Sequence, residues 1–423
     1  MDALFEHQDG VFENRDSLFE HQKEIIKESP RYCGLFWEIG TGKTAASIRL
    51  AENNSASTLV VCPKSIKQNW FREIKKWKTD INHKWSVVTK EELRAQTLKL
   101  VKMNFEGIII DEAHHFAGYQ SQMHRQIITY LYKVRPKCVY LLTGTPYLST
   151  PYNIMCYEKM IGHKVSFLKY RNRFFYIIKI GMKRFPKIKS GVEKDIAKLV
   201  KELGSVVRKD QCLDLPDRVF LREDFELNNQ QQLEIVNLDN DPRMANYIVY
   251  WTKMHQICGG TLKIDDNNHK SFECEKLNKI KEYSELYKKF IVVCRYNAEI
   301  EFIKNSITDK LVLTMNGQTE NRQELIDKAN SSEQVIFIIN AAISEGYNLV
   351  GMNLMIFYSH SFSFKDYVQM QGRIHRIGQI HKCTYINFVV RNTVDEDVLK
   401  ALEKKEDFSL EIYDRTKRIA ASI

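Results

Sequence analysis

The sequence predicts an α/β protein with two parallel sheets, each covered by helices on both faces. Short apolar runs alternate with polar or helical stretches through both ends of the chain, which is the pattern of parallel α/β layers. A middle region, residues 147–275, interrupts this rhythm. The length of 423 residues is also too great for one comfortable hydrophobic core. We therefore expect two sheet domains and a smaller element between them.

Ten apolar runs are the expected strands. Those of the first half are Gly34–Trp37, Thr58–Cys62, Val87–Val88, Gly107–Ile110 and Cys138–Leu142. Those of the second half are Phe290–Cys294, Leu311–Thr314, Gln334–Ile339, Leu354–Tyr358 and Thr384–Val389. Each set can build one parallel sheet, so we expect domains at residues 1–150 and 276–423. The second should close with a charged amphipathic helix at Thr393–Phe408.

Residues 151–275 are expected to be a basic, mostly helical insertion with a β-hairpin near Phe175–Ile188, turned at Gly181 and Gly191. Within it, residues 164–209 hold 14 Lys or Arg and 3 acidic residues, against a net charge of +10 for the whole chain. This mixture suits a nucleic-acid backbone, and its aromatic residues suit base stacking. The alternative is a solvated lysine-rich surface. The aromatic residues are Phe167, Tyr170, Phe174, Phe175, Tyr176 and Phe185.

A candidate phosphate loop, Gly40-Thr-Gly-Lys-Thr44, lies between an apolar strand and a helix. Such a loop offers backbone N–H groups and a helix N-terminus to phosphate oxygens. Lys43 would reach the β- and γ-phosphates, and the Thr44 hydroxyl would ligate Mg²⁺. Trp37 occupies the position where the strict pattern has its first glycine. Gly40, Thr41 and Gly42 complete the expected nucleotide contacts.

Two adjacent carboxylates end the strand Gly107–Ile110 in the run Asp111-Glu-Ala-His114. Asp111 suits the shell of Mg²⁺, whereas Glu112 suits positioning or deprotonating an attacking water. A strand that simply ends in polar residues is the alternative. The phosphate loop upstream favours the catalytic interpretation.

The composition, 43% hydrophobic and 27% charged, describes a soluble globular protein. We find neither a run of ~18 apolar residues nor a signal segment, so we expect the chain to stay inside the cell. Its nine scattered cysteines include no C-x-x-C pair, which favours reduced thiols. His255, Cys258 and Cys274 are candidate metal ligands, but a fourth ligand and tight spacing are missing.

In their order, these motifs resemble a superfamily-two helicase-type ATPase, and specifically the Swi/Snf-related double-stranded DNA translocases. The segments Leu59–Trp77, Leu141–Pro146 and His255–Cys258 resemble successive motifs of that family. Further along, Asn316–Arg322, Glu345–Leu349 and Gln369–Gln379 follow in the family's order. The resemblance covers nearly the whole chain and implies two RecA-like domains that bind ATP and Mg²⁺.

By this resemblance, Arg373 and Arg376 are arginine fingers that reach the γ-phosphate, and Gln369 helps to orient their segment and bind the nucleotide. A finger is worth roughly 10³–10⁵ in rate because it stabilises charge on the transferring phosphoryl group. Gln22 resembles the glutamine that reads adenine. The repeat of Leu4–Gln8 at Leu18–Gln22 leaves Gln8 as the alternative.

The resemblance also implies contacts with nucleic acid. The expected contact residues are Lys64, Ser65, Thr143, Gly317, Thr319 and Ser344 by the family's motifs, and Arg171, Arg173, Lys183 and Arg184 by local charge. Two departures stand out. The run Ala341–Glu345 replaces a Gly-rich turn, and His115 follows the DEAH box where a basic residue is commoner. Neither change removes a group required for hydrolysis.

We therefore expect an ATP- and Mg²⁺-dependent motor that tracks along DNA and remodels branched DNA, with the hairpin as a candidate wedge. We expect a monomer that does not associate with membranes. It should work in the cytoplasm, which would be that of the host if the chain is encoded by a phage. Its partners would be replication or recombination proteins. Three alternatives remain: an RNA helicase, an ATP-switched module that binds polymerase or nucleoprotein without translocating, and a nuclease-linked motor.

Overall fold

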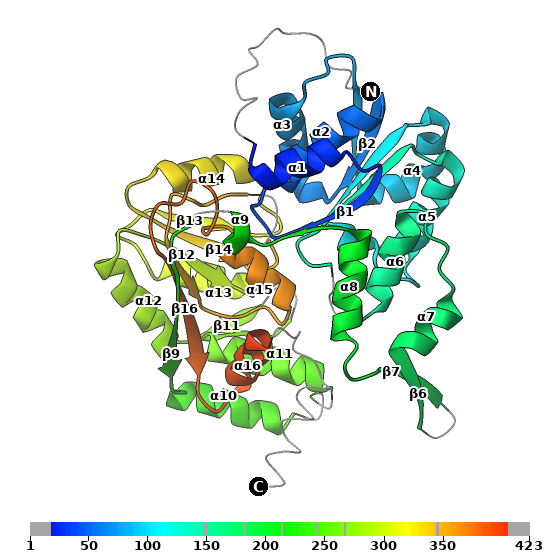
Figure 1. Ribbon diagram of the computed structural model, residues 1–423. Coiled ribbons are helices and arrows are strands. Elements are labelled where there is room, and N and C mark those ends of the chain that lie inside the picture. The colour runs from blue at the N-terminus through cyan, green and yellow to red at the C-terminus, as the bar shows by residue number, and fades with distance from the viewer. Residues whose placement is uncertain are drawn as a thin grey trace. The chain divides into compact units, whose positions relative to one another are not determined.

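The computed structural model describes residues 18–146, 150–180, 183–212, 215–241, 244, 246–265, 268–343 and 347–404. It divides into two compact units, Met1–Leu213 and Asp214–Ile423. Each unit is built around one six-stranded sheet, and the paired strands of both sheets run parallel (Figure 1). The α/β class with two RecA-like domains is confirmed.

The first unit has the strand order β3-β2-β4-β5-β1-β8. These strands are β1 (Tyr32–Trp37), β2 (Ser57–Cys62), β3 (Lys84–Thr89), β4 (Gly107–Asp111), β5 (Cys138–Leu142) and β8 (Gly204–Val207). The helices are α1 (Glu20–Glu28), α2 (Lys43–Asn54), α3 (Lys67–Trp77), α4 (Lys90–Met103), α5 (Gln122–Val134), α6 (Tyr152–Met160), α7 (Phe167–Phe174), α8 (Glu193–Leu203) and α9 (Lys209–Cys212), with short 3-10 helices η1 (Lys64–Ile66) and η2 (Ala113–Phe116).

The second unit has the strand order β13-β14-β12-β15-β16-β9. Its sheet contains β9 (Arg218–Phe225), β12 (Lys289–Cys294), β13 (Val312–Met315), β14 (Val335–Asn340), β15 (Leu354–Phe357) and β16 (Cys383–Val390), and β10 (Thr261–Lys263) pairs separately with β11 (His269–Ser271). The helices are α10 (Asn229–Asp239), α11 (Tyr247–Cys258), α12 (Glu275–Leu286), α13 (Asn297–Asn305), α14 (Arg322–Ser331), α15 (Phe364–Gln371) and α16 (Val394–Glu403).

Each sheet is buried on both faces because alternate residues of a strand point in opposite directions. In β4, Ile108 and Ile110 join a core with α4, α5, α6 and α8, whereas Ile109 joins a core with α2 and α3. In β12, Ile291 packs with α14, α15 and α16, whereas Val292 packs with α12 and α13. Such double burial explains why the strands read as continuous apolar runs.

All ten expected strands form, but the structure adds to the two six-stranded sheets two strands that we did not expect. Strand β8 pairs with β1, and β9 pairs with β16 along eight residues. Both lie within residues 151–275, so this segment is not a unit of its own: the part up to Leu213 belongs to the first unit and the part from Asp214 to the second. The sequence patterns that would predict these two strands are weak, because β8 has only four residues and β9 is mostly exposed.

The expected hairpin is present. Strands β6 (Phe175–Ile180) and β7 (Lys183–Ile188) pair antiparallel with Phe175 opposite Ile188. Gly191 has a φ of +79°, and Gly181 lies outside the described residues.

Three of the six aromatic residues that suggested base stacking pack into the protein core instead of forming an exposed surface. Tyr170, Phe174 and Phe175 are buried in the core of the first unit. Phe175 stacks on Tyr152 with ring centroids 4.4 Å apart, which fixes the base of the hairpin to α6. Tyr176 is 44% exposed. Aromatic residues between cationic ones therefore serve mainly to anchor this region.

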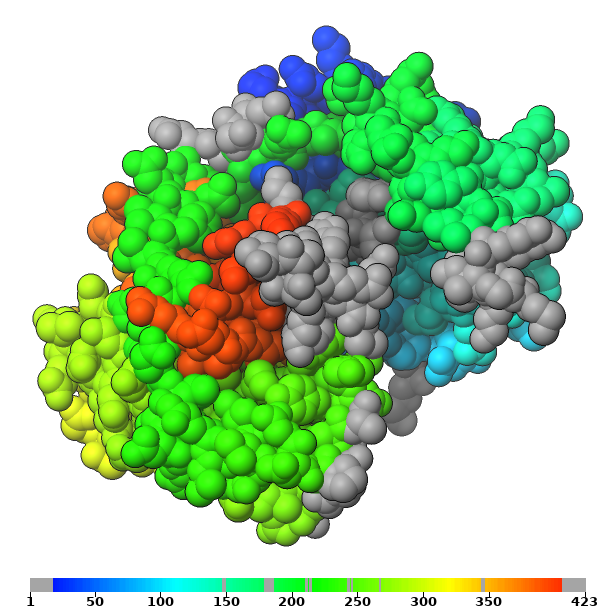
Figure 2. Space-filling model, turned by 90° about the horizontal axis from the view of Figure 1, so that it is seen from below, coloured from blue at the N-terminus to red at the C-terminus, as the bar shows by residue number. Residues whose placement is uncertain are grey.

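The two ends of the described chain are helical. Leu18–Gln22, the second copy of the short repeat, leads into α1, whereas Leu4–Gln8 lies outside the described residues. The closing helix α16 is capped by the Thr393 hydroxyl, which accepts from the Asp395 N–H, and residues 405–408 of the expected helix lie outside the described residues. Helices α10, α11 and α16 form part of the second unit's outer surface (Figure 2). No helix in the described ranges is long and apolar enough to cross a membrane.

An ion pair buried in the second unit joins α12 to α16. The Lys276 ammonium lies 2.5 Å from a carboxylate oxygen of Asp395, and the two side chains are 1% and 0% exposed. Lys276 also donates to the Tyr358 carbonyl, and Asp395 accepts from the Val390 N–H. Burial alone would raise the pKa of Asp395, but the charge of Lys276 holds that pKa below its usual value.

Asp395→Ala should lower the free energy of unfolding of the second unit by about 3–5 kcal/mol, because it leaves the Lys276 charge buried without its partner. Urea denaturation followed by circular dichroism measures this change. Glu301→Ala is the matched control, since Glu301 pairs with Lys304 at the surface at 3.9 Å; it should cost at most about 0.5 kcal/mol. Equal effects of the two substitutions would contradict this assignment.

Candidate functional site

The phosphate loop of the first unit connects β1 to α2, as the sequence predicts. Gly40 and Gly42 have φ values of +89° and +84°, which side-chain-bearing residues rarely adopt. The Lys43 ammonium donates to the carbonyls of Trp37 at 2.8 Å and Glu38 at 3.1 Å, so it folds back over the loop. Thr41 is fully buried, whereas Thr44 is partly exposed in the first turn of α2.

Helix α1 holds the loop from the side. The Gln22 amide nitrogen donates to the Gly42 carbonyl at 2.8 Å, and its oxygen accepts from the Phe19 N–H at 2.8 Å. A ring nitrogen of His21 lies 2.9 Å from the Thr41 carbonyl. Gln22 thus ties the start of α1 to the loop, and reading adenine would require these bonds to be exchanged. His21 has no counterpart among the predicted residues, because nothing in its sequence position marks it.

The unusual Trp37 has a structural explanation. Its indole N–H donates to the Ser205 hydroxyl at 2.9 Å, and its side chain is fully buried. Ser205 belongs to β8, one of the two unexpected strands. The His21 ring packs edge-on against the Trp37 ring, with centroids 4.7 Å apart. A tryptophan at the start of the loop therefore links the loop to the added edge strand and to α1.

Asp111 is the last residue of β4, at the carboxyl edge of the sheet, where open α/β sheets bind their ligands. One carboxylate oxygen accepts from the Glu112 N–H at 2.9 Å, and the other accepts from the Trp70 indole N–H at 2.8 Å. Burial, with the neighbouring Glu112 charge second, raises the pKa of Asp111 to about 7. The positive charge of Lys43 acts in the opposite direction.

Glu112 adopts a left-handed backbone conformation, with φ +48° and ψ +51°. This conformation costs a non-glycine residue on the order of 1–3 kcal/mol and is typical of functional sites. The Glu112 carboxylate contacts a group other than those that bond the Asp111 carboxylate. A Glu112 carboxylate oxygen lies 3.1 Å from the Nδ1 atom of His114.

His114 connects Glu112 to the end of β5. Its Nδ1 atom also lies 3.2 Å from the Thr143 hydroxyl, which in turn accepts from the Thr145 N–H. Thr143 is fully buried, and its expected contact with nucleic acid stays a prediction. We did not assign His114 a role, although its place in the DEAH run is a signal that could have found it.

The arginine segment of the second unit follows α15. Arg373 donates from Nη1 to the Tyr347 carbonyl at 2.8 Å and from Nε to the Gln369 carbonyl at 3.1 Å. Arg376 is partly exposed. The amide nitrogen of Gln379 donates to the Met352 carbonyl at 2.8 Å and holds the end of the segment. The guanidinium of Arg373 thus binds carbonyls of its own unit, and the assignment of Arg373 and Arg376 as fingers stays a prediction.

The other predicted contact residues lie at several places. Lys64 and Ser65 are exposed in η1. Gly317 is exposed in a turn after β13, in which Thr319 is partly exposed and accepts from the Asn316 N–H. Arg173 lies 3.5 Å from Asp195 on α8, and Arg171 is partly exposed. Lys183 and Arg184 belong to β7, but their side chains, like all of Ser344, lie outside the described residues.

The three candidate metal ligands make unrelated contacts. His255 contacts Asp395 and Tyr296, Cys258 contacts Thr393, and Cys274 contacts Tyr358. No group of three or more His, Cys, Asp or Glu residues in the described chain is arranged to hold a metal ion.

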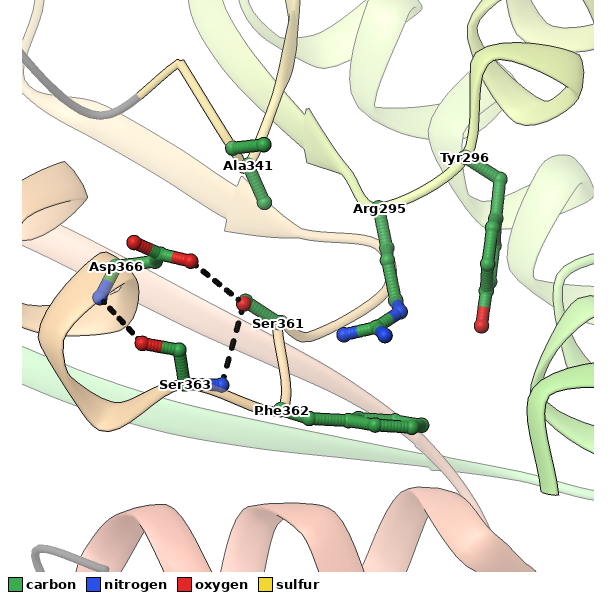
Figure 3. Close-up of a pocket in the computed structure, with 8 residues that line it drawn as sticks. Arg295, Tyr296, Ala341, Ser361, Phe362, Ser363 and Asp366 are labelled. Carbon is green, nitrogen blue, oxygen red and sulfur yellow. Dashed lines mark hydrogen bonds between the residues drawn. The ribbon is translucent and has the colours of Figure 1, made fainter. Parts of the chain in front are cut away.

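A pocket of about 530 Å³ opens at the carboxyl edge of the second sheet (Figure 3). The Arg295 guanidinium lies over the Phe362 ring, 3.6 Å from its centroid. Ser361 donates to Asp366 at 3.0 Å, and Ser363 caps α15 by accepting from the Asp366 N–H. Our sequence analysis missed this pocket, because Arg295 and Phe362 are 67 positions apart and neither belongs to a quoted motif.

Gly42→Ala should weaken nucleotide binding and lower the free energy of unfolding by more than the roughly 1–2 kcal/mol of left-handed strain. A Cβ at Gly42 would lie 2.1 Å from the Gln22 amide nitrogen and would displace it. Gly162→Ala is the matched control, with a φ of +92° and nothing within 4 Å of the added Cβ. Urea unfolding and a fluorescent ATP analogue measure both effects.

Adding Gln22→Ala to Gly42→Ala should recover the part of the stability loss that exceeds the control. If Gly42→Ala and Gly162→Ala lose the same stability, the Gln22 contact does not restrict the loop.

Two family models match the chain. The model described as "Type III restriction enzyme, res subunit" matches residues 4–148, and "Helicase conserved C-terminal domain" matches residues 275–378. The solved structure of the Sulfolobus solfataricus SWI2/SNF2 ATPase core in complex with dsDNA is 19% identical, with a TM-score of 0.42, and the match covers 92% of this chain and 91% of that one.

Curated relatives match most of the chain. An uncharacterized ATP-dependent helicase of Mycoplasma genitalium is 23% identical over 91% of this chain and 41% of its own length. The ISWI chromatin-remodeling complex ATPase ISW1 of Saccharomyces cerevisiae is 22% identical over 87% of this chain and 37% of its own length. The chain thus spans about two fifths of these relatives. A helicase model matches in the second unit, and an ATP-dependent helicase and a chromatin-remodeling ATPase match along most of the chain. These matches support a Swi/Snf-related helicase-type ATPase of superfamily two.

Proposed function

We propose that this chain hydrolyses ATP with Mg²⁺ and uses the energy to translocate along DNA. The observation that carries the proposal is the joint arrangement of Lys43, Asp111 and Glu112 in the first unit. Strands β1 and β4 lie on either side of β5 in one parallel sheet, so the loop after β1 and the two carboxylates at the end of β4 lie at the same carboxyl edge. This is the set of groups that phosphoryl transfer to water requires.

The residues fit a bound nucleotide and metal. The backbone of the loop, Lys43 and Thr44 would hold the triphosphate, and Thr44 and Asp111 would hold Mg²⁺. The two positive-φ glycines leave the loop backbone open to phosphate oxygens. Burial first, and the neighbouring Glu112 charge second, raise the pKa of Asp111, and a divalent cation would favour its ionised form. When bound, Mg²⁺ would neutralise charge on the phosphate oxygens.

The residues of the chain then have distinct tasks. Glu112 orients the attacking water and accepts its proton, while His114 holds the Glu112 carboxylate. The bond from His114 to Thr143 connects that carboxylate to the segment after β5. Arg376 stabilises charge on the transferred phosphoryl group when the two units close. Alternate closing and opening bias which unit grips the DNA.

Several surfaces are candidates for DNA. In the first unit, Lys64 and Ser65 are exposed at the start of α3. In the second, the pocket at Arg295 and Phe362 offers a cation and an aromatic ring, which suit a phosphate and a base. The S. solfataricus structure and ISW1 are relatives whose names point to double-stranded DNA and chromatin. Branched DNA is the substrate we propose, because the basic hairpin β6–β7 can act as a wedge at a junction.

Lys43→Ala and Glu112→Gln should each abolish ATP turnover, by a factor of at least about 10². Glu112→Gln should still bind a fluorescent ATP analogue, because the amide keeps the shape of the side chain. A coupled-enzyme assay with single-stranded, duplex, forked and junction DNA, and with RNA, measures turnover. DNA should stimulate the native chain more than RNA does.

Sustained hydrolysis by Glu112→Gln would contradict the role of Glu112. Stronger stimulation by RNA than by any DNA would instead favour an RNA helicase.

Removing Gly181–Ser190 should reduce unwinding or branch migration of a four-way junction by at least tenfold while changing basal ATPase less than twofold. The reason is that the hairpin lies away from the phosphate loop in sequence and carries four of the basic residues. Lys198→Ala with Lys201→Ala is the control, since it removes charge from exposed positions of α8. Equal loss of junction processing and basal hydrolysis in the deletion would rule out a wedge.

A further inference from the structure

Trp70 lies outside the predicted site but bonds directly to the carboxylate of a predicted metal ligand, Asp111. Its indole N–H donates to the second carboxylate oxygen of Asp111 at 2.8 Å. The other oxygen is held by the Glu112 N–H, so the two bonds together fix the rotation of the carboxylate. The Trp70 side chain is 1% exposed. Partners of this kind orient metal ligands, and losing one typically reduces metal affinity by about 10–100-fold.

Trp70 also lies close in the chain to a surface for nucleic acid. Exposed Lys64 and Ser65 form η1, and α3 begins at Lys67, one turn before Trp70. Ile66, Trp70 and Ile74 form the buried stripe of this helix. The start of α3 is held further by Lys67, whose ammonium contacts both oxygens of Glu92 at 2.9 and 2.8 Å. A shift of η1 would therefore move α3 and, through one hydrogen bond, the Asp111 carboxylate.

We propose that Trp70 is a positioning residue that transmits contact between DNA and Lys64–Ser65 to the metal-binding carboxylate of Asp111. This inference rests on the proposed function. In this proposal, binding of DNA strengthens binding of the Mg²⁺-nucleotide complex through the side chain of Trp70. Because coupling between two sites is reciprocal, DNA and Mg²⁺ should each strengthen the binding of the other.

The alternative is a purely structural role, in which Trp70 packs in the core and Asp111 accepts a hydrogen bond from its buried indole N–H. Trp77, on the same helix, offers a matched comparison. Its indole N–H donates to Glu73 at 2.9 Å, so Trp77→Phe removes the same kind of bond without touching Asp111. Trp70→Phe removes the donor but keeps an aromatic ring. Trp70→His keeps a ring N–H at the corresponding position but removes the benzene ring.

The test measures the Mg²⁺ concentration that gives half-maximal binding of a fluorescent, non-hydrolysable ATP analogue, with and without duplex DNA. DNA should lower this concentration for the native chain and for Trp77→Phe. For Trp70→Phe we expect a value at least roughly tenfold higher and little changed by DNA. Nucleotide binding in EDTA and duplex affinity in the absence of nucleotide should match the native chain. Trp70→His should retain most of the response to DNA.

A native response of Trp70→Phe to DNA would overturn the proposal, as would equal loss in Trp70→Phe and Trp70→His, which would assign the effect to packing. If Trp70→Phe does not fold, Trp70→His decides alone: a native-like response supports the link, and a lost response overturns it. Failure of the proposed function is distinguishable, because the native chain would then show no hydrolysis stimulated by DNA.

Discussion

The candidate site depends on keeping two adjacent carboxylates apart. Residues 111 and 112 follow one another, yet phosphoryl transfer needs one carboxylate near the metal and the other near the water. The left-handed backbone at Glu112 provides this separation, at a cost that the surrounding structure has to offset. The Glu112 N–H donates to the Asp111 carboxylate, and His114 contacts the Glu112 carboxylate. Chemistry here is therefore set by a strained turn at the end of one strand.

The contacts around that turn reach distant parts of the first unit. Trp70 connects the turn to α3, and Thr143 connects it to the end of β5. The charge of Lys43, from the phosphate loop, also acts on Asp111. The loop is held in turn by Gln22, and by Trp37 through β8. Apart from Lys43, these partners are buried and uncharged, so changes at Trp70, Thr143, Gln22 or Trp37 are expected to alter the direction of a carboxylate or of the loop rather than remove a charge. This arrangement is suited to coupling between hydrolysis and contact with DNA.

Much of the fold follows from local patterns. The ten apolar runs became strands because both faces of each sheet are covered, and the hairpin follows from basic and β-branched residues around a glycine. Strands β8 and β9 could not be predicted in this way, since β8 is very short and β9 is exposed at an edge. Their positions depend on pairing with β1 and β16, which is tertiary information.

The site divides in the same way. The phosphate loop and the DEAH run are contiguous motifs, so Lys43, Asp111 and Glu112 could be named from sequence. The hydrogen bonds of Gln22, Trp70 and Thr143, and the pocket at Arg295 and Phe362, join residues far apart in the chain. Arg373 could be named from its motif, whereas the hydrogen bond from its guanidinium to the Tyr347 carbonyl is tertiary information.

Displacement of a third strand from a DNA triplex tests most directly whether hydrolysis drives movement along DNA. The native chain should release the third strand in the presence of ATP and Mg²⁺, and should fail to release it with a non-hydrolysable analogue. Vigorous hydrolysis stimulated by DNA, with the third strand left in place, would contradict translocation and would favour an ATP-controlled binding module.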